Sequence, residues 1–269
     1  MTSVHSTDST TSRRGFGVTE RTDAWWVGPL LVFLGFSAFI VYSTWAAFQG
    51  VHYTSGRLLS PFYSPELFGD SPHSWFGPFP DWVPSFLPRS PALLILWVPG
   101  LFRFTCYYYR GAYYKGFWGD PPACAVGELR NTYLGENSLP LVLQNVHRYF
   151  LYLSIPFVVI LSWDGLQALA FDDGAGGTEF GLSVGTLVLL LNAFLIGGYV
   201  FGCHAFRHLA GGAFNRLSNR PGRRRIYECV GRLNRRHMAW AWCSLFWVAF
   251  ADVYVRLCSR GVWTDWRLL

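Results

Sequence analysis

GLSVGTLVLLLNAFLIGGYVFGCHAF, residues 181–206, is the stretch that decides the fold. It contains no Asp, Glu, Lys or Arg, and it is longer than the about 20 mostly apolar residues that a helix needs to cross a bilayer. Further apolar stretches lie at residues 24–48, 91–110, 141–171 and 237–257. The sequence therefore predicts an all-α, polytopic membrane protein built as a bundle of five transmembrane helices.

The composition supports this class of protein. Hydrophobic residues make up 51% of the chain and charged residues only 14%, whereas a soluble domain carries about a quarter charged residues. The 22 Lys and Arg residues lie in short segments between apolar runs, which is unlike the basic face of a nucleic-acid-binding fold. Both a soluble enzyme and a nucleic-acid-binding protein are therefore excluded.

The remaining segments give the predicted organisation of the chain. Residues 1–23 are polar and Ser/Thr-rich, and they lack the short apolar core of a signal peptide, so we expect a flexible tail. Residues 24–257 form the membrane domain, and residues 258–269 form a short tail. Within the domain we expect an ordered outer loop over 49–90, rich in Pro, Trp and Phe, and inner loops over 111–140 and 209–236.

The basic residues predict the orientation. With the N-terminus in the cytoplasm, the inner segments 1–23, 110–148 and 207–237 hold three, four and nine Lys or Arg residues. The outer segments 49–90, 172–180 and 256–269 then hold two, none and three. Because loops that stay in the cytoplasm are enriched in Lys and Arg, we expect the N-terminus inside the cell and the C-terminus outside.

Cysteine and histidine gather at one membrane face under this topology. The residues near the predicted cytoplasmic side are Cys106, Cys124, His147, His204, His208 and His237. His204 and His208 are four residues apart, so on a helix both imidazoles lie on one face and can reach one metal ion. A disulfide is disfavoured because the cytoplasm is reducing. The thiols of Cys203, Cys229, Cys243 and Cys258 are instead interpreted as small buried hydrophobes.

Cys106 and Cys124 are the predicted thiolate ligands. Two thiolates and two imidazoles could complete a zinc site or a Rieske-type 2Fe–2S cluster, while histidines on different helices could hold a b-type haem. Arg103 and Arg207 lie near these residues, where a guanidinium can offset negative charge on a cofactor. Charged residues inside a membrane are costly and are usually functional.

Four segments together resemble a known family: CYYYRGAYYKGFWGDPPACAV from Cys106, QNVHRYFLYL from Gln144, GCHAFRHLAGG from Gly202 and RRHMAWAW from Arg235. They are similar to the single-chain membrane anchor of succinate dehydrogenases (complex II), in particular the actinobacterial form. The resemblance spans residues 103–257.

The resemblance implies partners, a cofactor and a substrate. The partners are an FAD-containing dehydrogenase subunit and an iron–sulfur subunit on the cytoplasmic side of the plasma membrane. Electrons would pass through a Rieske-type 2Fe–2S cluster within the anchor to menaquinone. Haem-bearing relatives place histidines on four of five helices, and this chain departs from that pattern because its first helix has no His.

The ligand and quinone residues follow from this comparison. The expected thiolates are Cys106 and Cys124, and four histidines compete for two places, ranked His204 first, then His237 and His208, then His147. Near the quinone or the cluster we expect the following residues: Arg103, Tyr107, Asn145, Arg148, Arg207 and Trp240. Two alternatives stay open: the same anchor role with haem b, and a non-redox membrane protein with a structural zinc site.

Overall fold

The computed structural model describes residues 15–84, 86, 88–130, 138–139, 141–172, 176–212 and 215–269. The chain divides into two compact units, which are described separately. The first unit comprises Met1–Ser37 and Tyr109–Val142, and the second comprises Ala38–Tyr108 and Leu143–Leu269. The second unit holds nearly all of the helical core.

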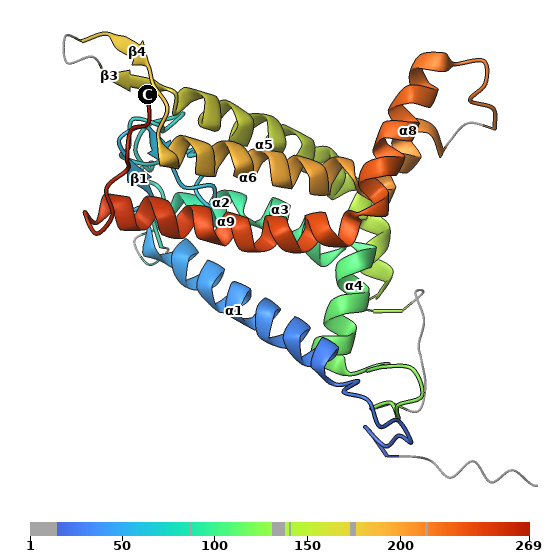
Figure 1. Ribbon diagram of the computed structural model, residues 1–269. Coiled ribbons are helices and arrows are strands. Elements are labelled where there is room, and N and C mark those ends of the chain that lie inside the picture. The colour runs from blue at the N-terminus through green and yellow to red at the C-terminus, as the bar shows by residue number, and fades with distance from the viewer. Residues whose placement is uncertain are drawn as a thin grey trace, which may run out of the picture. The chain divides into compact units, whose positions relative to one another are not determined.

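The described elements are mostly helices (Figure 1). The α-helices are α1 Val27–Gln49, α2 Pro91–Ile95, α3 Trp97–Phe104, α4 Tyr107–Tyr113, α5 His147–Gln167, α6 Val184–Phe201, α7 His204–Arg207, α8 Pro221–Arg235 and α9 His237–Ser259. Two short π-helices, η1 Tyr114–Trp118 and η3 His208–Gly212, and one 3₁₀-helix, η2 Leu141–Val146, accompany them.

Within the described ranges, two small antiparallel hairpins complete the regular structure. Strand β1 (Thr54–Ser55) pairs with β2 (Leu58–Leu59), and β3 (Ala170–Asp172) pairs with β4 (Thr178–Phe180). Both hairpins lie at the end of the second unit where α5 finishes and α6 begins, and the C-terminus lies at the same end (Figure 1).

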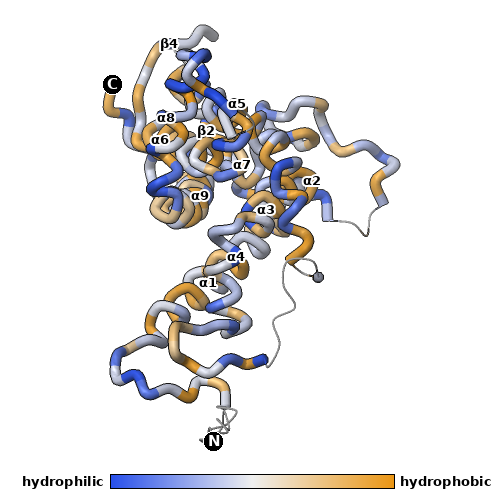
Figure 2. The backbone as a smooth tube through the Cα atoms, turned by 90° about the vertical axis from the view of Figure 1, so that its right-hand side faces the viewer, coloured by the Kyte–Doolittle hydropathy of each residue, from blue (hydrophilic) through white to orange (hydrophobic). Residues whose placement is uncertain are grey.

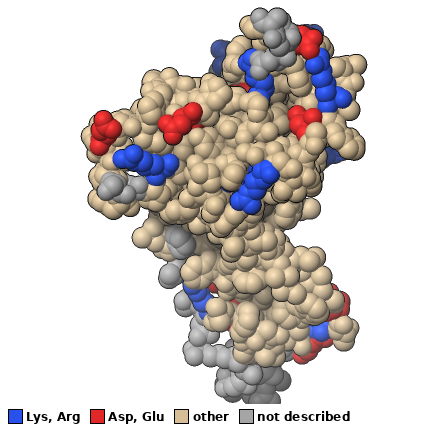
Figure 3. Space-filling model, turned by 90° about the vertical axis from the view of Figure 1, so that its left-hand side faces the viewer, with Lys and Arg blue, Asp and Glu red and all other residues tan. Residues whose placement is uncertain are grey.

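Among the described residues, four helical segments are long and apolar enough to cross a membrane: Val27–Gln49, Leu141–Gln167, Val184–Phe201 and His237–Ser259. They correspond to the predicted stretches 24–48, 141–171, 181–206 and 237–257. The tube of α9 is drawn mainly in hydrophobic colours in Figure 2. Figure 3 looks onto the end of the second unit that carries the hairpins, where Lys, Arg, Asp and Glu side chains are scattered among uncharged ones. The chain is thus a mostly helical, multi-pass membrane protein.

The predicted stretch 91–110 is not one continuous helix. It is divided into α2, α3 and the start of α4, with breaks at Leu96 and at Thr105–Cys106. Pro99 has no amide hydrogen, so it cannot donate to the carbonyl four positions earlier. This missing bond interrupts the helix at the first break. At the second junction the hydroxyl of Thr105 donates to the carbonyl of Leu101 at 2.7 Å, a side-chain bond that bends helices.

The core of the second unit is built around α6. Helix α6 packs against both α5 and α9, and α3 packs against α5. It begins at Ser183, whose side chain accepts a hydrogen bond from the amide of Thr186, the usual N-cap interaction. At the opposite end of the bundle, α8 packs on α7 and η3, and its sequence PGRRRIYECVGRLNR carries the densest run of arginines.

The loop between α1 and α2 is tightly packed. Tyr53 stacks on Tyr63 with ring centroids 4.3 Å apart, and its hydroxyl donates to the buried carboxylate of Glu66 at 2.8 Å. Burial and this hydrogen bond raise the pKa of Tyr53. This region corresponds to the predicted outer loop 49–90.

Of the predicted flexible tail 1–23, residues 1–14 lie outside the described residues, and residues 15–23 are described. The amide of Gly17 donates to the carbonyl of Gly127 at 3.0 Å, and the amide of Gly127 donates to Val18 at 2.9 Å. Thr19 adds a side-chain bond to the carbonyl of Ala125 at 2.7 Å. Backbone pairing within the first unit, which composition does not reveal, therefore holds residues 17–19.

A buried cysteine and histidine cluster

Four buried or half-buried side chains of the second unit meet where α5 and α9 begin and α6 ends. His147 and His237 are the first residues of α5 and α9, Cys203 follows the end of α6, and Cys106 lies between α3 and α4. These residues are far apart in the sequence, and the helix packing brings them together. We call Cys106, His147, Cys203 and His237 the Cys/His cluster.

The four side chains form two cysteine–histidine pairs. The Nε2 atom of His147 lies 3.0 Å from the sulfur of Cys203, and the Nε2 atom of His237 lies 3.6 Å from the sulfur of Cys106. The ring of Phe102 stacks on His147 and lies 5.5 Å from the ring of Tyr199, which in turn stacks on His237, so the two pairs are close to each other. Among the described residues, no three His, Cys, Asp or Glu side chains are arranged to hold a single metal ion.

A hydrogen-bond chain fixes the tautomer of His147. The hydroxyl of Thr105 donates to the carbonyl of Leu101, so its oxygen can accept a bond from Nδ1–H of His147 at 2.9 Å. The lone pair of Nε2 then faces the sulfur of Cys203. An imidazole whose other nitrogen donates in this way is oriented as metal-ligating histidines are.

Aromatic rings hold both imidazoles in place. Phe102 stacks on His147 with centroids 4.6 Å apart, and Tyr199 stacks on His237 at 5.0 Å. The Nδ1 atom of His237 is buried with no hydrogen-bond partner among the described residues. A buried polar atom without a partner is unfavourable in a folded protein. The Nδ1 atom of His237 is therefore available to bind a ligand.

Arg103 supplies a positive charge beside the cluster. Its guanidinium donates to the hydroxyl of Ser244 at 3.0 Å and to the carbonyl of Ala241 at 3.3 Å, both on α9. It also lies 4.6 Å from the centre of the Tyr199 ring, within the range of a cation–π interaction. Arg103, one of the residues singled out in the sequence, therefore lies next to the Cys/His cluster.

A cavity of about 150 Å³ adjoins the cluster. Its wall includes Ser154 of α5 and three residues that lie between the cavity and the cluster, Phe102, Arg103 and Tyr199. The hydroxyl of Ser154 is buried without a hydrogen-bond partner among the described residues. The rest of the wall is largely apolar, so the cavity matches the apolar clefts with few polar groups that hold small ligands.

The structure places the four candidate histidines in different surroundings. His204 and His208 are exposed, whereas His147, ranked last, is 3% exposed. His204 and His208 are four residues apart, but α7 ends at Arg207 and a π-helix begins at His208. The two histidines therefore do not share one regular α-helix. Burial therefore separates His147 and His237 from His204 and His208, the pair that the spacing favours.

The cysteines differ in the same way. Cys203, interpreted from the sequence as a small buried hydrophobe, is buried against His147. The signal that could have identified it is its place at the end of an apolar helix. Cys124 is exposed and lies in the first unit, where its carbonyl accepts a bond from Arg21 at 2.9 Å.

The other predicted residues take varied positions. Asn145, Arg148 and Tyr107 are exposed and do not line the cavity. Arg207 lies 4.7 Å from the ring of Tyr227 on α8. Trp240 packs edge-on against Phe194 at 5.6 Å. Of this group only Arg103 reaches both the cluster and the cavity.

The fold and this cluster define a multi-pass helical membrane protein with a buried Cys/His site at the end of its bundle. The comparisons make the class specific: residues 27–261 match the family described as actinobacterial succinate dehydrogenase subunit SdhC. The chain belongs to this family and is a membrane anchor subunit of succinate dehydrogenase.

A solved structure supports the same assignment. The chain is similar to a chain of the Mycobacterium smegmatis Sdh1 complex in the apo form, with 39% sequence identity and a TM-score of 0.84. The similarity covers 93% of this chain and 94% of that chain. Among curated protein sequences, no match is found.

Proposed function

We propose that this anchor carries electrons from a cytoplasmic iron–sulfur subunit through a Rieske-type 2Fe–2S cluster to menaquinone. The observation that carries the proposal is the pairing of two thiols and two imidazoles in one buried place. A Rieske-type cluster takes two Cys and two His ligands, so the donor set fits this group. The ligands would be Cys106, Cys203, His147 and His237, in place of the set expected from the sequence.

The donor set supports this cofactor rather than haem. Each imidazole is paired with a thiol, at 3.0 Å for His147 and Cys203 and at 3.6 Å for His237 and Cys106, and mixed Cys and His ligands are what a Rieske-type cluster takes. Phe102 and Tyr199 cover the ring faces. A two-iron cluster, when bound, would accept and pass on single electrons at a potential raised by its imidazole ligands.

The protein's own residues would position and tune the reaction. Arg103 places a positive charge between the cluster and the cavity, where it favours the uptake of an electron on either side. We propose that the quinone ring occupies the cavity of about 150 Å³, with Ser154 as a hydrogen-bond donor. Reduction to the quinol takes up two electrons, which succinate oxidation in the dehydrogenase subunit supplies, and two protons.

The partners and location complete the proposal. An FAD-containing subunit and an iron–sulfur subunit would dock on the cytoplasmic side, at the end of the bundle that carries the cluster and the arginines of α8. This keeps the N-terminus inside the cell and the protein in the plasma membrane. Counting the broken segment α2–α3 as a further crossing gives the five spans that the sequence predicts.

The test uses the complex purified with its dehydrogenase subunits. A rhombic electron paramagnetic resonance signal of low average g, lost in Cys203→Ser and in His147→Ala but kept in Cys243→Ser and His204→Ala, is expected. Succinate oxidation by a soluble dye should persist in all four variants, while quinone reduction should be lost only in the first two.

Other outcomes would overturn the proposal. Sharp reduced haem bands in the visible spectrum would replace the cluster by haem. Zinc without either spectroscopic signal would indicate a structural site. Loss of the signal in His204→Ala with retention in His147→Ala would restore the ligand ranking made from spacing.

A further inference from the structure

The loop that follows α1 enters the helix bundle. Residues 58–63, which we call the wedge, comprise β2 and the non-helical residues after it, and Leu58, Leu59, Ser60, Phe62 and Tyr63 are all buried. Leu59, Phe62 and Tyr63 pack against Val248 of α9 and against alanines of α1 and α2. Irregular backbone at this depth in a membrane protein needs its polar groups satisfied by the protein itself.

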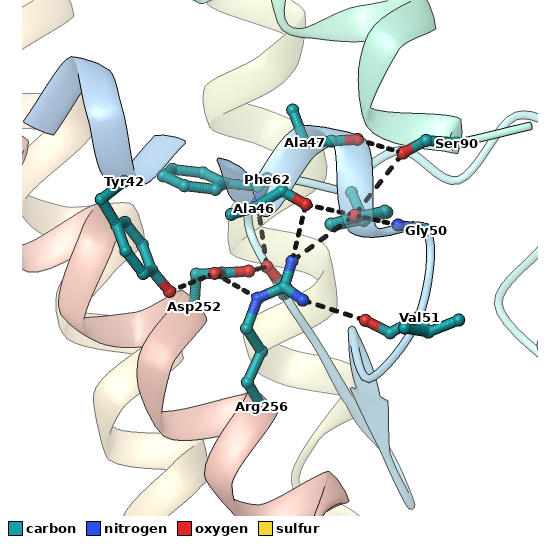
Figure 4. A network of polar contacts seen from close by, with 11 residues as sticks. Tyr42, Ala46, Ala47, Gly50, Val51, Phe62, Ser90, Asp252 and Arg256 are labelled. Atoms are coloured by element: carbon teal, nitrogen blue, oxygen red, sulfur yellow. Dashed lines mark hydrogen bonds and ion pairs between the residues drawn. The ribbon is translucent and has the colours of Figure 1, made fainter. Parts of the chain in front are cut away.

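A buried ion pair on α9 holds the wedge. Asp252 and Arg256 are 2.6 Å apart, with side chains 0% and 4% exposed. One carboxylate oxygen of Asp252 accepts a bond from the hydroxyl of Ser60 in the wedge, and the other accepts from the hydroxyl of Tyr42 on α1 at 2.6 Å. Figure 4 shows the side chain of Tyr42 on α1 pointing toward those of Asp252 and Arg256 on α9.

The guanidinium of Arg256 donates hydrogen bonds to the same two elements, α1 and the loop that follows it. It donates to the carbonyl of Val51 at 2.9 Å and to that of Ala46, at the end of α1, at 3.0 Å (Figure 4). Its third contact is the hydroxyl of Tyr63 in the wedge at 3.4 Å. The ion pair therefore joins three elements, and we call Tyr42, Ser60, Asp252 and Arg256 the clamp.

The clamp lies directly behind one wall of the cavity. Ser43, which follows Tyr42, lines the cavity, and so do Pro61 and Phe62, which follow Ser60. Val248, one helical turn before Asp252, also belongs to the wall. Each element that the clamp holds therefore contributes to the side of the cavity formed by α1 and the wedge.

We infer that the clamp is a positioning device that fixes this wall and thereby sets the affinity for the quinone. The inference rests on the proposed function, because it assigns the cavity to the quinone. Both oxygens of Asp252 are occupied by fixed donors, and Ser60 and Tyr42 contact the carboxylate rather than the cavity. The clamp residues act through Phe62 and Ser43, so their loss should alter binding more than turnover.

The test compares two mild variants with a matched control in the purified complex. Ser60→Ala and Tyr42→Phe each remove one hydroxyl from Asp252. Tyr254→Phe removes a comparable bond on the same helix, where the hydroxyl donates to Asp265 at 2.8 Å and the side chain does not line the cavity.

We expect the KM for quinone to rise by up to about tenfold in Ser60→Ala and in Tyr42→Phe, because a loosened wall can weaken binding by no more than the hydrogen bond that held it contributed. The kcat, succinate oxidation by a soluble dye and the paramagnetic signal should stay unchanged, and Tyr254→Phe should behave as wild type. Unchanged KM in both variants would overturn the inference, as would a fall in kcat at constant KM.

A third variant separates this inference from the proposed function. Ser154→Ala changes the cavity directly, without touching the clamp. If Ser154→Ala raises the KM for quinone while Ser60→Ala and Tyr42→Phe do not, the cavity stands and the clamp fails. If none of the three changes the KM, the assignment of the quinone to this cavity fails as well.

Discussion

Replacing Gly198 with alanine should destabilise the contact between α6 and α9. A Cβ atom at this position would lie 2.4, 2.6 and 2.8 Å from three ring atoms of Trp240. Small residues allow the backbones of membrane helices to approach closely, and here glycine lets the indole ring lie on the helix. The next residue, Tyr199, stacks on His237, so the same contact supports the Cys/His cluster.

The magnitude follows from two opposing effects. Alanine gains about 1 kcal/mol over glycine within a helix. Overpacking by one methyl group against a rigid ring costs about 1–3 kcal/mol, and Trp240 cannot move freely because it packs against Phe194. The net expectation is a loss of up to about 2 kcal/mol, which corresponds to a fall of a few degrees in Tm for a chain of this size.

Thermal unfolding of the complex in detergent measures this loss. The control is Gly231→Ala in α8, where the only atom within 4 Å of an added Cβ is the Nε of Arg207 at 3.9 Å. This variant gains helix propensity without a clash, so its Tm should stay the same or rise. Combining Gly198→Ala with Trp240→Leu removes the clashing ring and should give less destabilisation than the sum of the two single changes.

The reasoning is refuted if Gly198→Ala raises the Tm as much as the control does. Strict additivity in the double variant would also contradict it, because the clash requires both residues. A further consequence is spectroscopic: displacement of Tyr199 should alter the line shape of the paramagnetic signal in Gly198→Ala but not in Gly231→Ala.

Three further predictions test other parts of the structure. Asp252→Asn leaves Arg256 buried without its counter-charge, so it should cost about 3–5 kcal/mol of stability, whereas Arg267→Gln, in an ion pair about half exposed, should cost less than about 1 kcal/mol; equal shifts in Tm would contradict this. The raised pKa of Tyr53 means that the folded state keeps this proton after an unfolded tyrosine loses it near pH 10. Stability should therefore fall as the pH rises above about 10, and Tyr53→Phe should make the fall shallower in alkaline unfolding curves. Arg103→Gln removes a positive charge beside the cluster and should lower its midpoint potential in a redox titration, and a raised or constant potential would refute that role.

Part of the site was predictable from the sequence. Cys106, His237 and Arg103 were identified because polar and thiol side chains near the ends of apolar helices are rare and costly. His147 was recognised but ranked last, and Cys203 was passed over, because a cysteine at the end of an apolar helix looks like a small hydrophobe. Spacing along one helix favoured His204 and His208, and it carries no information about which face of that helix is buried.

The sequence by itself determined that this is a helical membrane protein and where its long apolar helices lie, because the bilayer imposes length and hydrophobicity on each span separately. It also indicated the family through local segments. Only the tertiary structure decided that Cys203 meets His147, that residues 58–63 enter the bundle, and that Asp252 and Arg256 clamp them. These features depend on side chains from distant helices facing one another, which the packing of the helices sets and no local pattern encodes.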